Sequence, residues 1–158
     1  MLTCLGIALP SSSLLAAALG RHRVRYIGGT WTQLEAGTPG RFDLTDESGA
    51  FFVMDKGERL AIPFQSITSL EYGQKSGRRI GATIGWGMAV GAWMLPMLLS
   101  KKRKHYLSIG FTGADAKAQG VVLELGKDIT RATLKTLEVR SGRKIEFETT
   151  DARNNVGN

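Results

Sequence analysis

The chain has 158 residues, enough for one domain with an appendage, and 42% of them are hydrophobic, which is ample for a core. It carries 21 basic and 14 acidic residues, for a net charge of +7, and one cysteine, Cys4. A single cysteine excludes an internal disulfide and a cysteine-rich metal site. His22 and His105 lie far apart, and neither has a partner at metal-ligand spacing, so we expect no metal, no cofactor and no enzymatic activity.

The chain begins with an uncharged stretch over residues 2–20, in which Leu14–Leu19 resembles the apolar region of a signal peptide. Pro10 interrupts the stretch, and Arg21 follows it directly, where positive charge resists translocation. A degenerate signal peptide, a weak anchor and a misassigned start all remain open. We predict a signal-like or anchor segment over residues 1–23.

Seven short segments of strand character follow, and most of them are joined by short turns. Apolar residues alternate with polar ones, and turn-forming residues such as Asp55-Lys56-Gly57 separate the segments. This pattern predicts a mainly β domain over residues 24–148, built as a seven-stranded antiparallel barrel or sandwich. The predicted strands are Val24–Tyr26, Phe42–Leu44, Ala50–Met54, Leu60–Ile62, Ile67–Tyr72, Leu107–Phe111 and Val121–Leu125.

An insertion over residues 80–100 separates the fifth and sixth predicted strands, and its residues 80–99, here called the apolar run, contain no charged side chain. As a helix the run would be ~30 Å long, close to the thickness of a bilayer core. No acidic residue occurs between Glu71 and Asp115, and the basic residues of that interval account for the whole net charge. These residues, here called the basic flanks, are Lys75, Arg78, Arg79, Lys101, Lys102, Arg103 and Lys104.

A single crossing of a bilayer by the apolar run would separate the first five strands from the last two, and the sheet edges would be unpaired. The run therefore favours a re-entrant or interfacial hairpin with both ends on one membrane surface. The basic flanks are the predicted site for anionic lipid. The predicted membrane-contacting residues are Trp86, Met88, Val90, Trp93 and Leu95.

Three other interpretations of this region remain open. The run could be a helix buried against the β domain. Its two G-x-x-x-G spacings, formed by Gly81, Gly85, Gly87 and Gly91, are compatible with a homo-oligomer. Residues 101–104 could contact nucleic-acid phosphates, but base-reading motifs and interleaved aromatic residues are absent, so nucleic acid is a weaker candidate.

One amphipathic helix is expected after the seventh strand. Asp128 is its candidate N-cap, and Ser141-Gly142 ends it. Residues 143–148 alternate and indicate a possible eighth, edge strand. The polar residues 149–158 are expected to form a flexible tail.

Seven strands followed by one helix resemble the pleckstrin-homology-like superfold, including its GRAM relatives, and the best local match is Ile62–Ile67. That resemblance implies a bent two-sheet barrel closed at one end by the helix. The basic pattern with which eukaryotic members bind phosphoinositides is missing, because the loop 34–40 contains Glu35 and no Lys or Arg. A closer resemblance, which carries no known activity, is to a group of uncharacterised bacterial envelope-associated proteins, through YIGGT at 26–30, SLEYGQKSGRR at 69–79, KKRKHYLSIGFT at 101–112 and VVLELGKDI at 121–129.

The sequence thus predicts a membrane-associated, non-catalytic binding or scaffold module of the cell envelope. Its expected partner is an anionic membrane surface, reached through the apolar run and the basic flanks. The alternative is a soluble interaction domain, possibly nucleic-acid binding, whose apolar run is folded inward.

Overall fold

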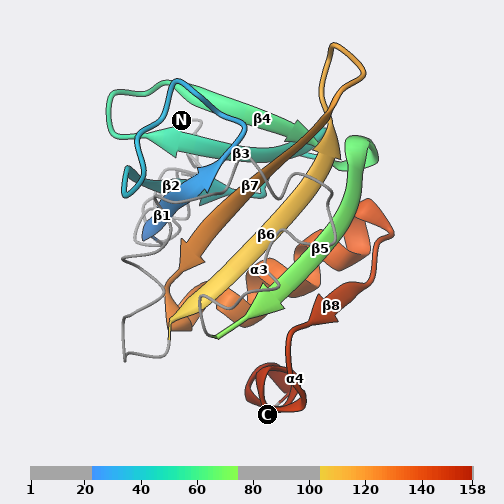
Figure 1. Ribbon diagram of the computed structural model, residues 1–158. Coiled ribbons are helices and arrows are strands. Elements are labelled where there is room, and N and C mark those ends of the chain that lie inside the picture. The colour runs from blue at the N-terminus through green and yellow to red at the C-terminus, as the bar shows by residue number, and fades with distance from the viewer. Residues whose placement is uncertain (1–22, 75–103, 158) are drawn as a thin grey trace, which may run out of the picture.

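The computed structural model describes residues 23–74 and 104–157. Within these residues the chain forms one sheet with the strand order β4-β3-β2-β1-β7-β6-β5-β8 (Figure 1). All seven predicted strands are present. Their bounds are β1 Arg23–Gly29, β2 Pro39–Asp43, β3 Gly49–Met54, β4 Arg59–Pro63, β5 Ile67–Gly73, β6 His105–Thr112 and β7 Ala118–Leu125.

The core lies on one face of the strands, because alternate side chains of each strand point to the same side. Leu107 pairs with Leu123 on β7 and with Tyr72 on β5, and all three are buried. At the β1 end of the core, the ring of Trp31 lies 5.9 Å from that of Tyr26 and 6.1 Å from that of Phe52. These aromatic rings fill the bend of the sheet and hold its two halves together.

The predicted mainly β domain with a C-terminal helix is confirmed, but the sheet of the described residues has eight strands and stays open, so it is not the seven-stranded closed barrel that is one form of the prediction. An eighth strand, β8 Ile145–Phe147, pairs in parallel with β5 and occupies the edge of β5. Between β4 and β5, the 3-10 turn η1 Phe64–Ser66 redirects the chain. β4 and β8 are therefore the two edges of the sheet, and β4 does not pair with β5.

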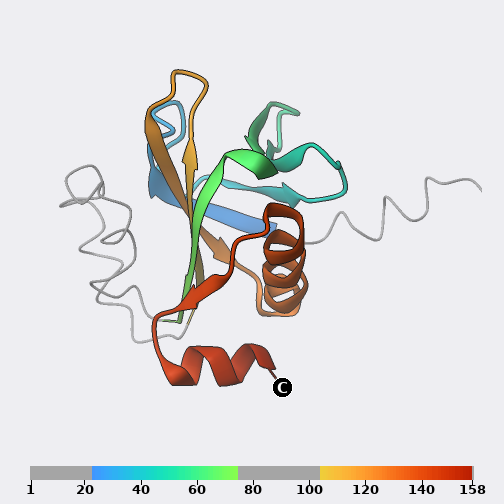
Figure 2. The same ribbon diagram turned by 90° about the vertical axis from the view of Figure 1, so that its right-hand side faces the viewer.

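Helix α3 Lys127–Ser141 packs on one side of the sheet and buries Ile129, Leu134 and Leu137 (Figure 2). Its N-cap is Gly126 and not Asp128, which lies in the first turn, where its charge favours the positive end of the helix dipole. The predicted end is confirmed: Gly142 adopts a left-handed conformation and its N–H donates to the Glu138 carbonyl at 3.1 Å.

Residues 150–157, expected to be part of a flexible tail, form helix α4 Thr150–Gly157. Ala152 is 1% exposed, and Val156 packs against the core. Thr149 Oγ1 accepts the Ala152 N–H at 3.1 Å. Two apolar residues at i and i+4 in a polar stretch give only a weak helical pattern, which explains why the sequence did not predict this helix.

Candidate functional site

The described residues on either side of the insertion, Gln74 and Lys104, lie together at the end of the β5–β6 pair. Gly73 pairs with Tyr106, and the Lys104 N–H donates to the Gln74 carbonyl at 3.2 Å. The chain therefore leaves the sheet after Gln74 and returns at Lys104 next to the same point. Residues 75–103 between them lie outside the described residues.

The N-terminal segment joins the sheet at the same end. One row of paired residues runs across four strands, from Gly73 to Tyr106, then to Glu124 and Arg25. Arg23, the first described residue, precedes Arg25 on β1. Both uncharged stretches of the sequence, residues 2–20 and the apolar run, are thus attached to one end of the sheet.

Lys104 is the one member of the basic flanks that the structure describes. Its Nζ donates to Glu124 Oε2 at 2.9 Å, and the two side chains are 33% and 20% exposed. An ammonium group already paired with a carboxylate is less available to a lipid phosphate. In the structure, Lys104 is therefore part of an ion pair within the sheet, which makes it a weaker candidate than the other basic flanks for contact with lipid.

Tyr72 on β5 is buried and His105 on β6 is partly buried, and the two side chains form a pair beside Lys104. This place, where the chain leaves and re-enters the sheet, is here called the root of the insertion. The Tyr72 hydroxyl lies 2.5 Å from His105 Nδ1, and the two rings are stacked with centroids 6.1 Å apart. Burial, and secondarily the positive charge of Lys127, lowers the pKa of His105 below its ordinary value of 6.5. The lowered pKa favours the neutral imidazole, and the tautomer with its proton on Nε2 can accept a hydrogen bond from the Tyr72 hydroxyl at Nδ1.

Residues of the C-terminal segment also contact Tyr72 at the root of the insertion. The Glu148 N–H donates to the Tyr72 carbonyl at 2.9 Å, and the Phe147 ring packs edge-on against Tyr72 with centroids 5.9 Å apart. The guanidinium of Arg153 on α4 lies 5.5 Å from the centre of the Phe147 ring. The two contacts of Tyr72 could not be predicted from the sequence, because they join residues more than seventy positions apart.

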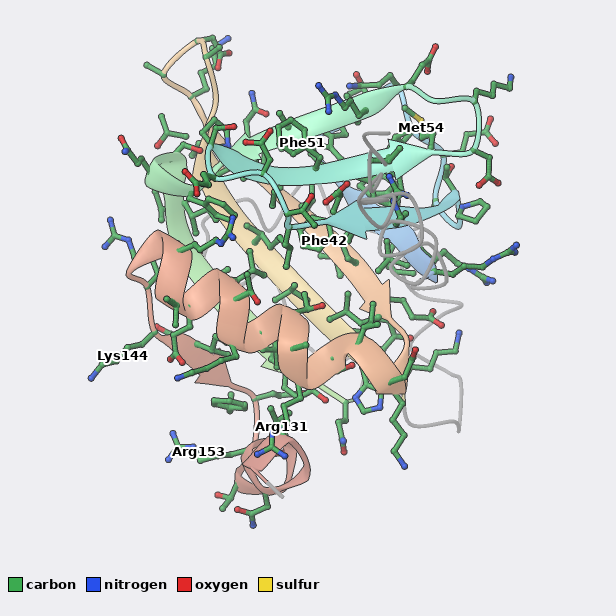
Figure 3. The ribbon with its side chains drawn as sticks, turned by 180° about the vertical axis from the view of Figure 1, so that it is seen from behind. Phe42, Phe51, Met54, Arg131, Lys144 and Arg153 are labelled. Atoms are coloured by element: carbon green, nitrogen blue, oxygen red, sulfur yellow. The ribbon has the colours of Figure 1, made fainter. Side chains whose placement is uncertain are left out.

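Exposed basic side chains also occur near this end, but acidic ones accompany them. Figure 3 shows Arg131 pointing from α3 toward α4, which carries Arg153. Lys127 begins α3. Asp128 lies on α3, Glu124 on β7, and Glu148 directly follows β8, so the described residues give no strong positive excess there. In the sequence, the excess of positive charge lies in the basic flanks.

A groove of about 610 Å³ lies between β2 and α3, where Figure 3 shows Phe42. Arg41 Nη2 and Asp43 Oδ2 are 3.4 Å apart in its wall. The hydrogen bond from the Thr45 hydroxyl lowers the pKa of Asp43. Asp128 and Arg140 line the opposite wall, so the charges balance and select neither anions nor cations. The sequence did not predict this groove, because its two walls are distant along the chain.

The other predicted site residues lie outside the described residues: Trp86, Met88, Val90, Trp93 and Leu95, the four glycines of the G-x-x-x-G spacings, and Lys75, Arg78, Arg79, Lys101, Lys102 and Arg103. Among the residues that the structure does describe, no helix has the length and apolar character needed to cross a bilayer. Nor do three or more His, Cys, Asp or Glu side chains of that part come together as a candidate metal site.

No family model and no curated protein matches this chain. Its function must therefore be argued from the geometry described above.

Proposed function

We propose that the protein is a membrane-associated, non-catalytic binding or scaffold module that engages an anionic bilayer of the cell envelope. The observation that carries the proposal is the row Gly73–Tyr106–Glu124–Arg25. It attaches the apolar run and the uncharged N-terminal stretch to one end of the sheet. Both apolar segments can then reach one membrane surface without dividing the sheet.

Two physical terms support binding at this end. Burial of apolar side chains such as Trp86 and Trp93 contributes on the order of 25 cal/mol per Å² removed from water. Each Lys or Arg of the basic flanks near anionic headgroups contributes about 1 kcal/mol. The first term persists in salt and the second does not, so the two are separable by experiment.

We also propose that the fold is a variant of the pleckstrin-homology-like superfold. Strands β1 to β4 and β5 to β7 form two antiparallel meanders joined through the β1–β7 pair, and one helix follows β7. The open edge at β4 and the additional strand β8 depart from that pattern. The proposal concerns the arrangement of strands and brings no ligand with it.

The second candidate is a soluble interaction domain whose apolar run is folded inward. One observation favours it: Ile27 and Val122 are fully buried although they do not belong to the main core cluster. An apolar run folded against the sheet would cover these two side chains. This candidate and the first differ in whether the protein partitions onto lipid.

The test is sedimentation of the full chain with phosphatidylcholine vesicles, with and without phosphatidylglycerol. We expect binding to the anionic vesicles, and only partial release at about 0.5 M NaCl, where the Debye length falls to a few Å. Replacing residues 80–99 by a short Gly/Ser turn should abolish the salt-resistant fraction. Complete recovery of the full chain in the supernatant at low salt would contradict the proposal.

A further inference from the structure

We infer that the face of the sheet opposite α3 is the docking surface of the apolar run. This face carries a set of buried side chains, here called the outer patch: Ile27, Glu71, Tyr106, Ser108 and Val122. The inference goes beyond membrane binding, because it assigns the run an intramolecular contact that exists without lipid.

The strand registers place the outer patch away from the core. Ser108 pairs with Val122 on β7 and with Glu71 on β5, whereas their neighbours in sequence belong to the main core. Paired residues of antiparallel strands point to the same face, so these three point away from α3. An exposed sheet face would leave them open to water, yet Ser108 and Val122 are 0% exposed and Glu71 is 8% exposed.

No described element covers the outer patch. In Figure 2, α3 lies on one side of β5, β6 and β7, and no described helix or strand lies on the other side. Glu71 Oε1 and Ser108 Oγ are buried and have no hydrogen-bond partner. Buried polar atoms of this kind indicate a face that packs against another part of the molecule.

Two glycines at the centre of this face leave room for another segment to pack closely against the strands. Gly110 pairs directly with Gly120, and both are buried. Glycine inside a strand often marks a place where another backbone approaches closely. The apolar run is itself rich in small residues, with glycines at 81, 85, 87 and 91. Small residues on both surfaces permit a short distance between a helix and the strands.

The places where the insertion joins the sheet favour the apolar run as the segment that covers the outer patch. Short linkers join the run to Gln74 after β5 and to Lys104 before β6, and these two strands carry three of the five residues of the patch. As a helix the run would be about 30 Å long, and β6 with its eight residues is about 26 Å long. Such a short tether gives a high effective concentration at the face.

Docking uses only one side of the run. A helix that is apolar all round, as this sequence would be, buries one side on the sheet and leaves the opposite side apolar. That opposite side remains available to a bilayer. The docked run and the membrane-bound module are therefore compatible, and each is tested without assuming the other.

The test uses the full chain without lipid, in a Cys4→Ser background. Ser108→Cys is combined in turn with a cysteine at each position from 85 to 93, and the proteins are oxidised. We expect a disulfide within one chain at a subset of positions spaced three or four residues apart, seen as a cross-linked peptide in the monomer band. Absence of any such disulfide would overturn the inference.

A second measurement is the rate at which maleimide labels Ser108→Cys alone. Thr112→Cys is the matched control, because Thr112 lies on the same strand and face but is exposed. We expect labelling at position 108 to be at least about tenfold slower than at 112, and to reach the control rate when residues 80–99 are replaced by a Gly/Ser turn.

Three results would assign the face to another occupant and overturn the inference. A disulfide found only in the dimer band would indicate a second copy. Protection lost on deletion of residues 2–20, but not on replacement of the run, would indicate the N-terminal segment. Protection that appears only with vesicles would indicate the bilayer itself.

Discussion

The hydrogen bond between Tyr72 and His105 is the contact at the root of the insertion that responds most directly to pH. The phenol oxygen and His105 Nδ1 are 2.5 Å apart, and in the neutral tautomer with the proton on Nε2 the imidazole is the acceptor. Protonation of His105 replaces that acceptor by a donor and places a charge in a half-buried position. Burial already opposes that charge, because it lowers the pKa of His105.

We predict that the free energy of unfolding falls as the pH is lowered from about 7 to 5. The pKa of His105 is lowered in the folded state, so below its ordinary value of 6.5 the unfolded state binds the proton first. His105→Gln should flatten this dependence, as measured by urea unfolding at several pH values. The pKa values of Asp43, Asp46 and Asp115 are also lowered in the folded state, but they affect the free energy of unfolding only as the pH falls below their ordinary value of 3.8. Equal slopes for the two proteins would contradict the prediction.

Gly29 is the second single position with a clear consequence. Its φ is +143°, and a Cβ added there would lie 2.1 Å from the Gly120 carbonyl oxygen. Gly29→Ala should therefore lower the free energy of unfolding by roughly 2–4 kcal/mol, because backbone must move.

Gly57→Ala is the matched control for this change. Gly57 also has a positive φ, of +86°, but a Cβ there meets no atom within 4 Å. Its cost should be about 1 kcal/mol, from conformational strain alone. Denaturant unfolding of both variants measures the difference, and equal costs would show that the contact with Gly120 is absorbed elsewhere.

At the scale of elements, the insertion is an addition to a sheet whose strand pairing is complete without it. The β5–β6 pair extends to Gly73 and Tyr106, and the Lys104–Gln74 hydrogen bond continues it by one more step. The strand pairing therefore needs no residue of the insertion. The outer patch, in contrast, needs a cover.

Replacing residues 80–99 by a short Gly/Ser turn should thus leave a folded, cooperatively unfolding β domain. We expect a free energy of unfolding lower by about 2–5 kcal/mol and a tendency to self-associate, because Ile27, Tyr106 and Val122 become exposed. Circular dichroism, urea unfolding and light scattering measure these effects. A monomer of unchanged stability would show that the run does not cover the sheet, whereas loss of cooperative unfolding would show that it belongs to the main core.

At the scale of the whole molecule, charge is distributed unequally. Outside the basic flanks the sequence has 14 basic and 14 acidic residues, and the described ion pairs include Lys104–Glu124 and Arg41–Asp43. The excess of positive charge therefore lies in the flanks, and we expect the proposed attraction to an anionic surface to come from them.

Changing Lys101, Lys102 and Arg103 to Gln should weaken binding to anionic vesicles by about two orders of magnitude, at about 1 kcal/mol for each charge. Binding to phosphatidylcholine vesicles should change little. Lys104→Gln is the matched control. Because Lys104 is paired with Glu124, the affinity of this variant for anionic vesicles should fall by less than about threefold. Equal losses for Lys104→Gln and for a single change at Lys101 would contradict this distinction. A salt-dependent loss of polynucleotide binding in the triple variant would instead favour the nucleic-acid interpretation.

The sequence alone determined the seven strands, helix α3 and the position of the insertion, because alternation, helical periodicity and turn residues act over short stretches of chain. Asp128 shows the limit of such local signals. It has the side chain of an N-cap and stands near the start of the helix, yet Gly126 takes that position. Element boundaries depend on how the chain leaves the preceding strand.

The alternation over residues 143–148 indicated the edge strand β8, but only the tertiary structure decided that it pairs in parallel with β5 and that the sheet stays open. It also decided that Lys104 is paired, that Tyr72 meets His105, and that both uncharged stretches are attached to one end of the sheet. These facts depend on pairing between strands far apart in sequence. Periodicity shows which side of a strand is apolar, but the register between strands determines which residues come together.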